Sequence, residues 1–430
     1  MKKVLHEYRL FLSYPWDMRV LLTTNLVYGL VMPVIEMFIG AYVMRKSDDP
    51  KMVVTYQLAV YTAVPIAFVV NGWLLRHISI KRLYSVGMLL SGVSMVIMMN
   101  LPELDLIGLG GAGLLMGVAA SLYWANRDFL VLSSTEDANR NYYYGLENFF
   151  ATNMNIVVPL AVGSFIGWYG QDDSGRVGDA YRIITGVVFA LGLVASLIVQ
   201  RGRFRNPPHT GFVYFRYHAI WNRAMLICLI KAVSDGYIVT APAMLVMTLV
   251  GKESSLGALL SAGGMVSAVL LYLVGRTAGP RYRVHLLAAG LSLFLVGSLA
   301  NAALYSALGV LLFMLLLVLA RPLADFAGFT IILGAMDKAS QIEKRNPYSY
   351  VMIREFAAYI GRAGGCLLFI SLAYYVSTQF ALRYALVLIG VLQLLSVPVA
   401  HSVLQGCYAT ETSSEGDSAL CETRSTTGNF

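Results

Sequence analysis

The chain has 430 residues and a formal net charge of +8, and 57% of its residues are hydrophobic while only 13% are charged. Soluble globular proteins carry about 25% charged residues, so this chain lacks the charges that a soluble domain needs to cover its surface. The composition therefore excludes a soluble globular protein and predicts a surface that faces lipid.

Apolar segments long enough to span a bilayer follow one another along nearly the whole chain. About 20 apolar residues cross the hydrocarbon core as an α-helix. We predict twelve transmembrane helices, over residues 20–43, 53–75, 83–101, 106–126, 146–168, 182–200, 224–250, 256–275, 284–305, 309–334, 356–376 and 380–400. The predicted fold is all-α and polytopic, with six-helix bundles at 1–200 and 224–400, a central cytoplasmic loop at 201–223 and a disordered cytoplasmic tail at 401–430.

The distribution of lysine and arginine predicts the orientation of these helices. With the N-terminus inside, most of the 32 basic residues fall in cytoplasmic segments, as the positive-inside rule requires. The outer segments hold only a few, namely Arg45, Lys46, Lys51, Arg176, Arg182, Lys252 and Arg383. We therefore expect a multi-pass inner-membrane protein with both termini in the cytoplasm, and we interpret the net charge as a topology signal with no nucleic-acid partner.

The loop after the second predicted helix carries a recognisable motif, Gly72-Trp-Leu-Leu-Arg76-His77-Ile-Ser79-Ile-Lys81-Arg82. The signature of the major facilitator superfamily at this place is a glycine, an acid and a base, a second glycine and two further bases. Gly72, Lys81 and Arg82 match that signature in type and spacing, whereas Arg76 replaces the acid and Ser79 replaces the second glycine. With two sets of six helices around a basic loop, the chain resembles this superfamily of transporters.

The resemblance implies a carrier that works by alternating access between two pseudo-symmetric bundles. It also implies that Gly72, Lys81 and Arg82 belong to a cytoplasmic gate, and we add the charged residues near cytoplasmic helix ends, Arg127, Asp128 and Glu147. The fifth helix partly matches a drug/proton antiporter signature through Pro159 and the glycines after it, which favours export. Small residues there can equally serve close helix packing.

Six ionisable side chains lie well inside the predicted spans, and each is costly at bilayer depth. They are Glu36, Lys231, Asp235, Arg321, Asp325 and Arg362. Lys231 and Asp235 share a helix face because they are four residues apart, and Arg321 and Asp325 repeat that spacing. Two interpretations stay open: structural bridges between helices, or a polar site at which Lys231, Arg321 or Arg362 faces an anionic solute.

Glu36 has no basic residue within a helical turn. Apolar surroundings favour the neutral form of a lone carboxyl, so Glu36 is our first candidate for proton coupling, followed by Asp235 and Asp325. The alternative is a glutamate that hydrogen-bonds to a neighbouring helix or reaches the outer interface. Further candidates for contact with the solute are polar or aromatic residues inside the spans, namely Asn25, Tyr28, Trp124, Asn155 and Tyr237.

No enzyme constellation is apparent in the sequence. It contains no P-loop, so we expect no ATP-driven cycle, and it offers neither a nucleophile–histidine–acid set nor a cysteine or histidine spacing typical of a metal site. We expect a monomeric secondary transporter of a small organic solute, coupled to protons and without a cofactor or metal. The alternatives are an uncoupled facilitator, a proton-coupled importer of an anionic solute, a flippase for a lipid-linked substrate and a membrane sensor that does not transport.

Overall fold

The computed structural model describes residues 11–101, 103–135, 137–170, 174–206, 216–251, 253–277, 282–345 and 347–407. This part of the chain holds 12 helical segments long and apolar enough to cross a membrane. Each of them overlaps one predicted span, and the expected all-α, polytopic fold in two six-helix bundles is confirmed.

The N-terminal bundle consists of the helices that follow one another up to residue 199. They are α2 (Trp16–Gly29), α3 (Met32–Ser47), α4 (Pro50–Leu74), α5 (Ile80–Met99), α6 (Leu106–Ser134), α7 (Asp137–Tyr169) and α8 (Ser174–Val199). The C-terminal bundle begins at residue 219. It consists of α9 (Ala219–Ile238), α10 (Ala241–Leu249), α11 (Glu253–Thr277), α12 (Arg283–Leu304), α13 (Ala307–Glu343), α14 (Pro347–Tyr375) and α15 (Thr378–Leu394).

The first helix of each bundle is broken near its middle. Pro33 stands in the first turn of α3, and Pro242 stands in the first turn of α10. A proline lacks the amide hydrogen that an uninterrupted helix would use, so it is tolerated where a new helical segment begins. Each pair, α2 with α3 and α9 with α10, therefore crosses the membrane as two segments.

Two boundaries differ from the sequence prediction. Helix α9 begins at Ala219, inside the range 201–223 expected to be a loop, and residues 207–215 of that range lie outside the described part of the chain. After α15 the chain stays helical to Cys407, beyond the predicted end at residue 400. The rest of the expected tail, residues 408–430, also lies outside the described residues.

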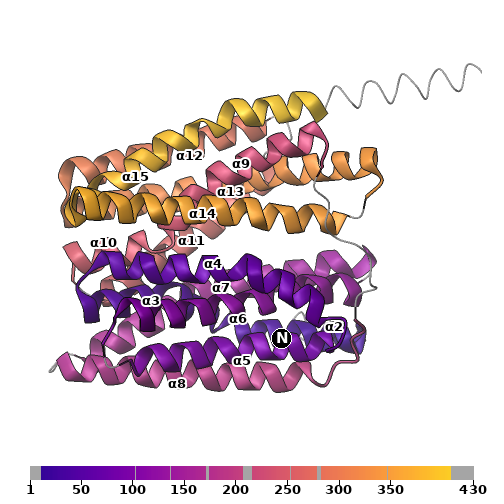
Figure 1. Ribbon diagram of the computed structural model, residues 1–430, viewed down its shortest axis with the longest axis horizontal. Helices are drawn as coiled ribbons and strands as arrows, with labels where there is room; N and C mark the ends of the chain where they lie inside the picture. Colours follow the sequence, from indigo (N-terminus) through magenta and orange to yellow (C-terminus); the bar gives the residue numbers. More distant parts are fainter. Residues whose placement is uncertain are drawn as a thin grey trace, which may run out of the picture.

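The two bundles lie side by side (Figure 1). They contact each other where α7 packs on α11, α4 on α14 and α3 on α10. We call the end of the molecule where α2 begins and α8 ends the terminal face; there the indole of Trp16 donates to the carbonyl of Arg201 at 3.1 Å. The end where α3 and α10 stop is the opposite face, so the contact between α3 and α10 joins the bundles on that side.

Candidate functional site

An alternating chain of charges joins α9 to α13 in the C-terminal bundle. The ammonium group of Lys231 lies 3.1 Å from a carboxylate oxygen of Asp235 on its own helix and 3.1 Å from one of Asp325 on α13. Arg321 lies one turn before Asp325, with its Nε 3.6 Å from the other oxygen of that carboxylate. Lys231 is therefore held between two carboxylates, and the two helix-internal pairs expected from the sequence form one cluster.

The cluster opens into a small pocket inside the C-terminal bundle. Its lining includes the four charged residues and the polar side chains of Ser234, Gln393 and Ser396. The space accessible to water is about 40 Å³, which holds one or a few water molecules but no organic solute. The charged side chains themselves stay 25–51% exposed, so the cluster is partly accessible and not sealed inside the bundle.

Glu36 of the N-terminal bundle belongs to the same region. Its side chain is exposed, and it lies close enough to Arg321 for the two charges to interact. The two charges come from opposite bundles, on α3 and α13, so their interaction runs from one bundle to the other. Arg321 therefore pairs with Asp325 in its own bundle, and Glu36 of the other bundle acts on the same guanidinium at longer range.

Tyr61 of α4 connects the N-terminal bundle to the cluster from another side. Its hydroxyl donates to the backbone carbonyl of Asp235 at 3.2 Å. The guanidinium of Arg362, on α14, lies over the Tyr61 ring at 5.4 Å from the centroid, and it also lies 3.8 Å from a carboxylate oxygen of Glu355. A cation over an aromatic face is attracted to it, so this contact holds α4 against α14.

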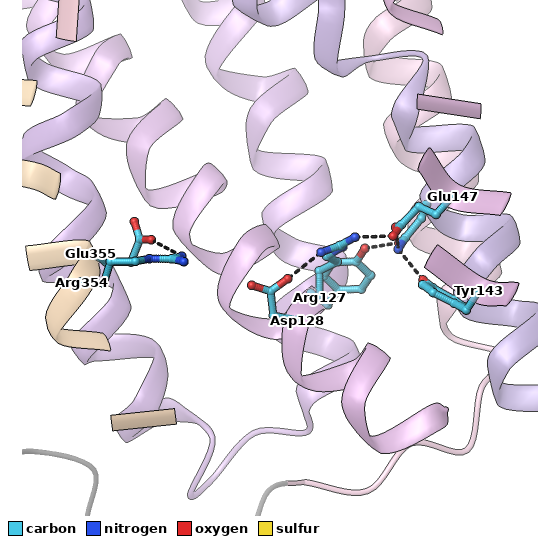
Figure 2. Close-up of polar contacts among 8 residues, drawn as sticks. Arg127, Asp128, Tyr143, Glu147, Arg354 and Glu355 are labelled. Carbon is cyan, nitrogen blue, oxygen red and sulfur yellow. Dashed lines mark hydrogen bonds and ion pairs between the residues drawn. The ribbon is translucent and has the colours of Figure 1, made fainter. Parts of the chain in front are cut away.

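A second polar network is buried inside the N-terminal bundle (Figure 2). The side-chain amide of Asn25 donates to the hydroxyl of Tyr143 and to a carboxylate oxygen of Glu147, both at 2.8 Å, and accepts from the hydroxyl of Tyr84. Arg127 forms an ion pair with the other oxygen of Glu147. Asn25 and Glu147 are thus satisfied by their own bundle.

The aromatic candidates next to this network differ in their exposure. Tyr28 is buried, its hydroxyl donates to Ser91 at 2.8 Å, and its ring packs on Tyr123 with centroids 4.5 Å apart. Trp124 is 43% exposed, with the Arg127 guanidinium over its ring at 5.6 Å. In this conformation Trp124 presents an aromatic face to its surroundings, whereas Tyr28 does not.

Tyr237 and Asn155 lie apart from the charged cluster. The ring of Tyr237 is fully buried and stacks on Phe369 of α14, with centroids 4.8 Å apart. Asn155 is exposed on α7, and its backbone approaches Gly264 of α11. Tyr237 thus holds α9 to α14, and Asn155 lies where α7 packs against α11.

The bases of the loop motif make contacts within their own bundle. The ammonium of Lys81 donates to the carbonyls of Gln200 and Gly202, at 3.1 and 3.2 Å, which lie just past the end of α8. Arg82 is exposed, and a side chain at Gly72 would meet open space. Lys81 therefore satisfies carbonyls at a helix C-terminus, where a cation is favourable.

Near the terminal face, charged pairs from the two bundles face each other (Figure 2). Asp128 of α6 is 50% exposed and pairs with its neighbour Arg127 at 2.7 Å. Arg354 of α14 pairs with its own neighbour Glu355 at 2.9 Å. Asp128 and Arg354 point toward one another, so an approach of the bundles on this side would bring opposite charges together.

The structure also contains functional candidates that the sequence did not single out. Tyr61 bridges the bundles, Gln393 lines the pocket, and Tyr84 and Tyr143 hold Asn25. A polar or aromatic residue inside a span was the only available signal, and many residues of this chain share it.

Comparisons with known proteins bear on the fold. No known protein-family model matches the chain. Over 377 residues it is 20% identical to the uncharacterized protein YqgE of Bacillus subtilis (strain 168), and this alignment covers 86% of each chain.

Two solved structures are similar over nearly their full lengths. One is a bacterial homolog of the human lysosomal transporter Spinster in an inward-facing, unoccupied conformation, with a TM-score of 0.62, 13% identity, and coverage of 91% of this chain and 97% of that one. The other comes from work on substrate recognition in proton dependent oligopeptide transporters, with a TM-score of 0.63, 12% identity, and coverage of 90% and 98%. At these identities the shared feature is the fold.

Proposed function

We propose that this chain, which has the fold of the major facilitator superfamily, is a proton-coupled secondary transporter of a small organic solute. The observation that carries the proposal is the chain of charges Asp235–Lys231–Asp325–Arg321 with Glu36 opposite Arg321. Ionisable groups at bilayer depth are costly, so they almost always face the interior of a bundle or a water-filled cavity, and they mark ion and solute pathways.

The arrangement offers a direct way to couple a proton to a solute. When Asp325 is ionised, its two oxygens occupy Lys231 and Arg321. A proton on Asp325 removes that negative charge and frees both bases for a carboxylate or another anionic group of the solute. Proton and solute binding are then linked, because each changes the charge that the other meets.

Glu36 links proton binding to the conformation of the two bundles. Its charge attracts Arg321 across the interface, so ionised Glu36 favours the conformation in which α3 and α13 stand as they do here. Protonation of Glu36 removes this attraction and favours the exchange of conformations. The broken helices at Pro33 and Pro242 lie in the same region and allow local bending.

The antiporter-like residues of α7 have a packing role that is independent of direction. A Cβ atom at Gly257 of α11 would lie 2.3 Å from the carbonyl oxygen of Pro159 and 3.1 Å from the Cα of Gly163. Small residues let the two bundles approach closely here, so we base no preference for export on them.

Thermal-shift screening of the purified protein tests the proposal. The panel contains small carboxylates, amines and neutral amphipathic compounds, each measured at about pH 5.5 and at about pH 8. We expect a stabilising ligand with an anionic group whose effect depends on pH in the wild type and no longer depends on it in Asp325→Asn. Asp337→Asn, which removes an exposed carboxylate on the same helix as Asp325 but outside the cluster, is the matched control and should behave as the wild type. A ligand with the same pH dependence in Asp325→Asn would contradict the proposal.

A further inference from the structure

The small pocket inside the C-terminal bundle contains a buried hydroxyl that no other described residue satisfies. Ser234 follows Lys231 by three residues on α9, so the two side chains share a helix face. Ser234 is 1% exposed and lines the pocket, and its hydroxyl has no hydrogen-bond partner among the described residues. Buried hydroxyls that lack a protein partner are usually satisfied by ordered water, so this hydroxyl points to water in the pocket.

The pocket also has the size and the polarity that ordered water requires. Its space of about 40 Å³ exceeds the roughly 10–15 Å³ that one water molecule occupies. Asp235, Asp325 and Gln393 line the same space as Ser234, so a water there has several polar partners. Among the described residues, α12 and the helix that includes α15 add only uncharged side chains to the lining. The ionisable groups that meet this water therefore come from α9 and α13.

The two carboxylates of the cluster are close enough to exchange a proton through water. Each has an oxygen 3.1 Å from the Lys231 ammonium, so these two oxygens lie no more than about 6 Å apart, a distance that one or two waters bridge. A charged Lys231 or Arg321 cannot relay the proton, because each group donates hydrogen bonds and accepts none. Water and the Ser234 hydroxyl both donate and accept, so they can relay it.

We propose that water held by Ser234 in this pocket carries a proton from Asp325 to Asp235, an inference that rests on the proposed function. An O–H bond breaks at the Asp325 carboxyl, the water accepts this proton and passes one on, and an O–H bond forms at Asp235. Lys231 stays an ammonium throughout, and no further reactant is needed. Asp325 is the more exposed carboxylate, at 43% against 25% for Asp235, so Asp325 takes up the proton first.

The position of the proton decides whether Arg321 is free for an anionic solute. With the proton on Asp325, Lys231 keeps Asp235 as its partner, and Arg321 loses the carboxylate that lies 3.6 Å from its Nε. With the proton on Asp235, the carboxylate of Asp325 holds Lys231 and Arg321 again. Transfer into the pocket therefore closes the anion site while the proton stays in the protein, so the solute leaves before the proton does.

Charged and titratable groups from several helices surround the two carboxylates. They are Lys231 on α9, Arg321 on α13, Arg362 and Glu355 on α14, Glu36 on α3 and Tyr61 on α4. These groups influence the pH at which the pair takes up a proton, whereas the pocket provides the route between the carboxylates. A test of the route must therefore change the pocket and leave every charge in place.

Two variants change the pocket in this way, each with a matched control. Gly328→Ala fills part of the pocket without a collision, because its Cβ would lie 4.0 Å from its nearest neighbour, the Cδ1 atom of Leu287. Its control is Gly334→Ala, on the same helix but outside the lining, where a Cβ would meet open space. Ser234→Ala removes the hydroxyl and keeps the space. Its control is Ser298→Ala, which removes a buried hydroxyl of α12 outside the lining.

Infrared difference spectroscopy of the purified protein, without any solute, observes the carboxyls and the water together. Spectra are recorded as the pH is lowered from about 8 to about 4, where ordinary carboxyls take up protons. The carbonyl stretches of the protonated carboxyls are assigned with Asp235→Asn and Asp325→Asn. Bands of water are identified by their shift in water enriched in the heavy oxygen isotope. The melting temperature at the higher pH verifies that each variant is folded.

In the wild type and both controls we expect both carboxyl bands and an isotope-sensitive water band that changes as the carboxyls are protonated. In Gly328→Ala and Ser234→Ala we expect the water band to be lost and the Asp325 band to remain. After a rapid drop in pH, the Asp235 band should then rise later than the Asp325 band, whereas the two rise together in the wild type.

The failure of this inference is distinguishable from that of the proposed function. A water band that persists in both pocket variants, or no such band in the wild type, would overturn the relay and leave proton uptake by Asp325 intact. Simultaneous rise of the two carboxyl bands in both pocket variants would overturn it as well. If neither carboxyl band appears in the wild type, the proposed proton coupling fails together with the relay.

Discussion

Replacing Lys231 by glutamine removes the centre of the charged cluster and leaves two carboxylates without their shared cation. At an effective dielectric constant of 20, each of its contacts at 3.1 Å is worth about 5 kcal/mol of gross attraction. The desolvation of the ions cancels most of this, and the side chains are 25–43% exposed. Breaking a fully buried pair costs about 3–5 kcal/mol, so we expect Lys231→Gln to lower the free energy of unfolding by about 1–2 kcal/mol.

A double-mutant cycle measures this coupling directly. Because Lys231→Gln/Asp235→Asn removes one charge of each sign, Asp325 keeps Arg321 as its partner and the cluster stays balanced. We therefore expect the double variant to regain most of the stability that Lys231→Gln loses, as read from thermal unfolding in one detergent at one pH near neutrality. Independent, additive losses from the two substitutions would refute the view that the cluster acts as one unit.

Two further predictions concern the packing of the bundles, each with its own control. Glu147→Gln should lower the free energy of unfolding by about 1–3 kcal/mol, because it removes the charge from a buried hydrogen-bond acceptor. Asp128→Asn, at an exposed carboxylate, should change it by no more than about 0.5 kcal/mol. Equal melting temperatures of the two variants would contradict this prediction. Gly257→Ala should lower the free energy of unfolding by about 1–3 kcal/mol, because the new Cβ would collide with the carbonyl of Pro159. Gly110→Ala, whose Cβ would meet open space, should be tolerated. An unchanged melting temperature for both variants would show that α7 and α11 separate easily.

The membrane-spanning architecture was predictable because hydropathy is a local property. A run of about 20 apolar residues identifies a span wherever it occurs, and all the predicted spans have counterparts in the structure. The helix-internal pairs were predictable for the same reason, since residues four apart share a helix face: Lys231 pairs with Asp235 and Arg321 with Asp325.

The contacts between helices were not predictable from these patterns. Lys231 also binds Asp325 because α9 packs on α13, and Glu36 interacts at longer range with Arg321 of the other bundle. Nothing local in the sequence tells which helices become neighbours. Asn25 is a second example: its place inside a span predicts a contact with the solute, but its amide group already donates to Tyr143 and Glu147.

The central claim is that the charge of Glu36 sets the balance between two arrangements of the bundles. Spin labels at Asp128→Cys and Arg354→Cys, which face each other near the terminal face, report that balance as a distance distribution by pulsed electron paramagnetic resonance. Between about pH 8 and about pH 5.5 we predict a shift toward the shorter distance, because a protonated Glu36 releases Arg321, and no such shift in Glu36→Gln. The same pH-dependent shift in Glu36→Gln, or a distance independent of pH in the labelled protein that retains Glu36, would contradict the claim.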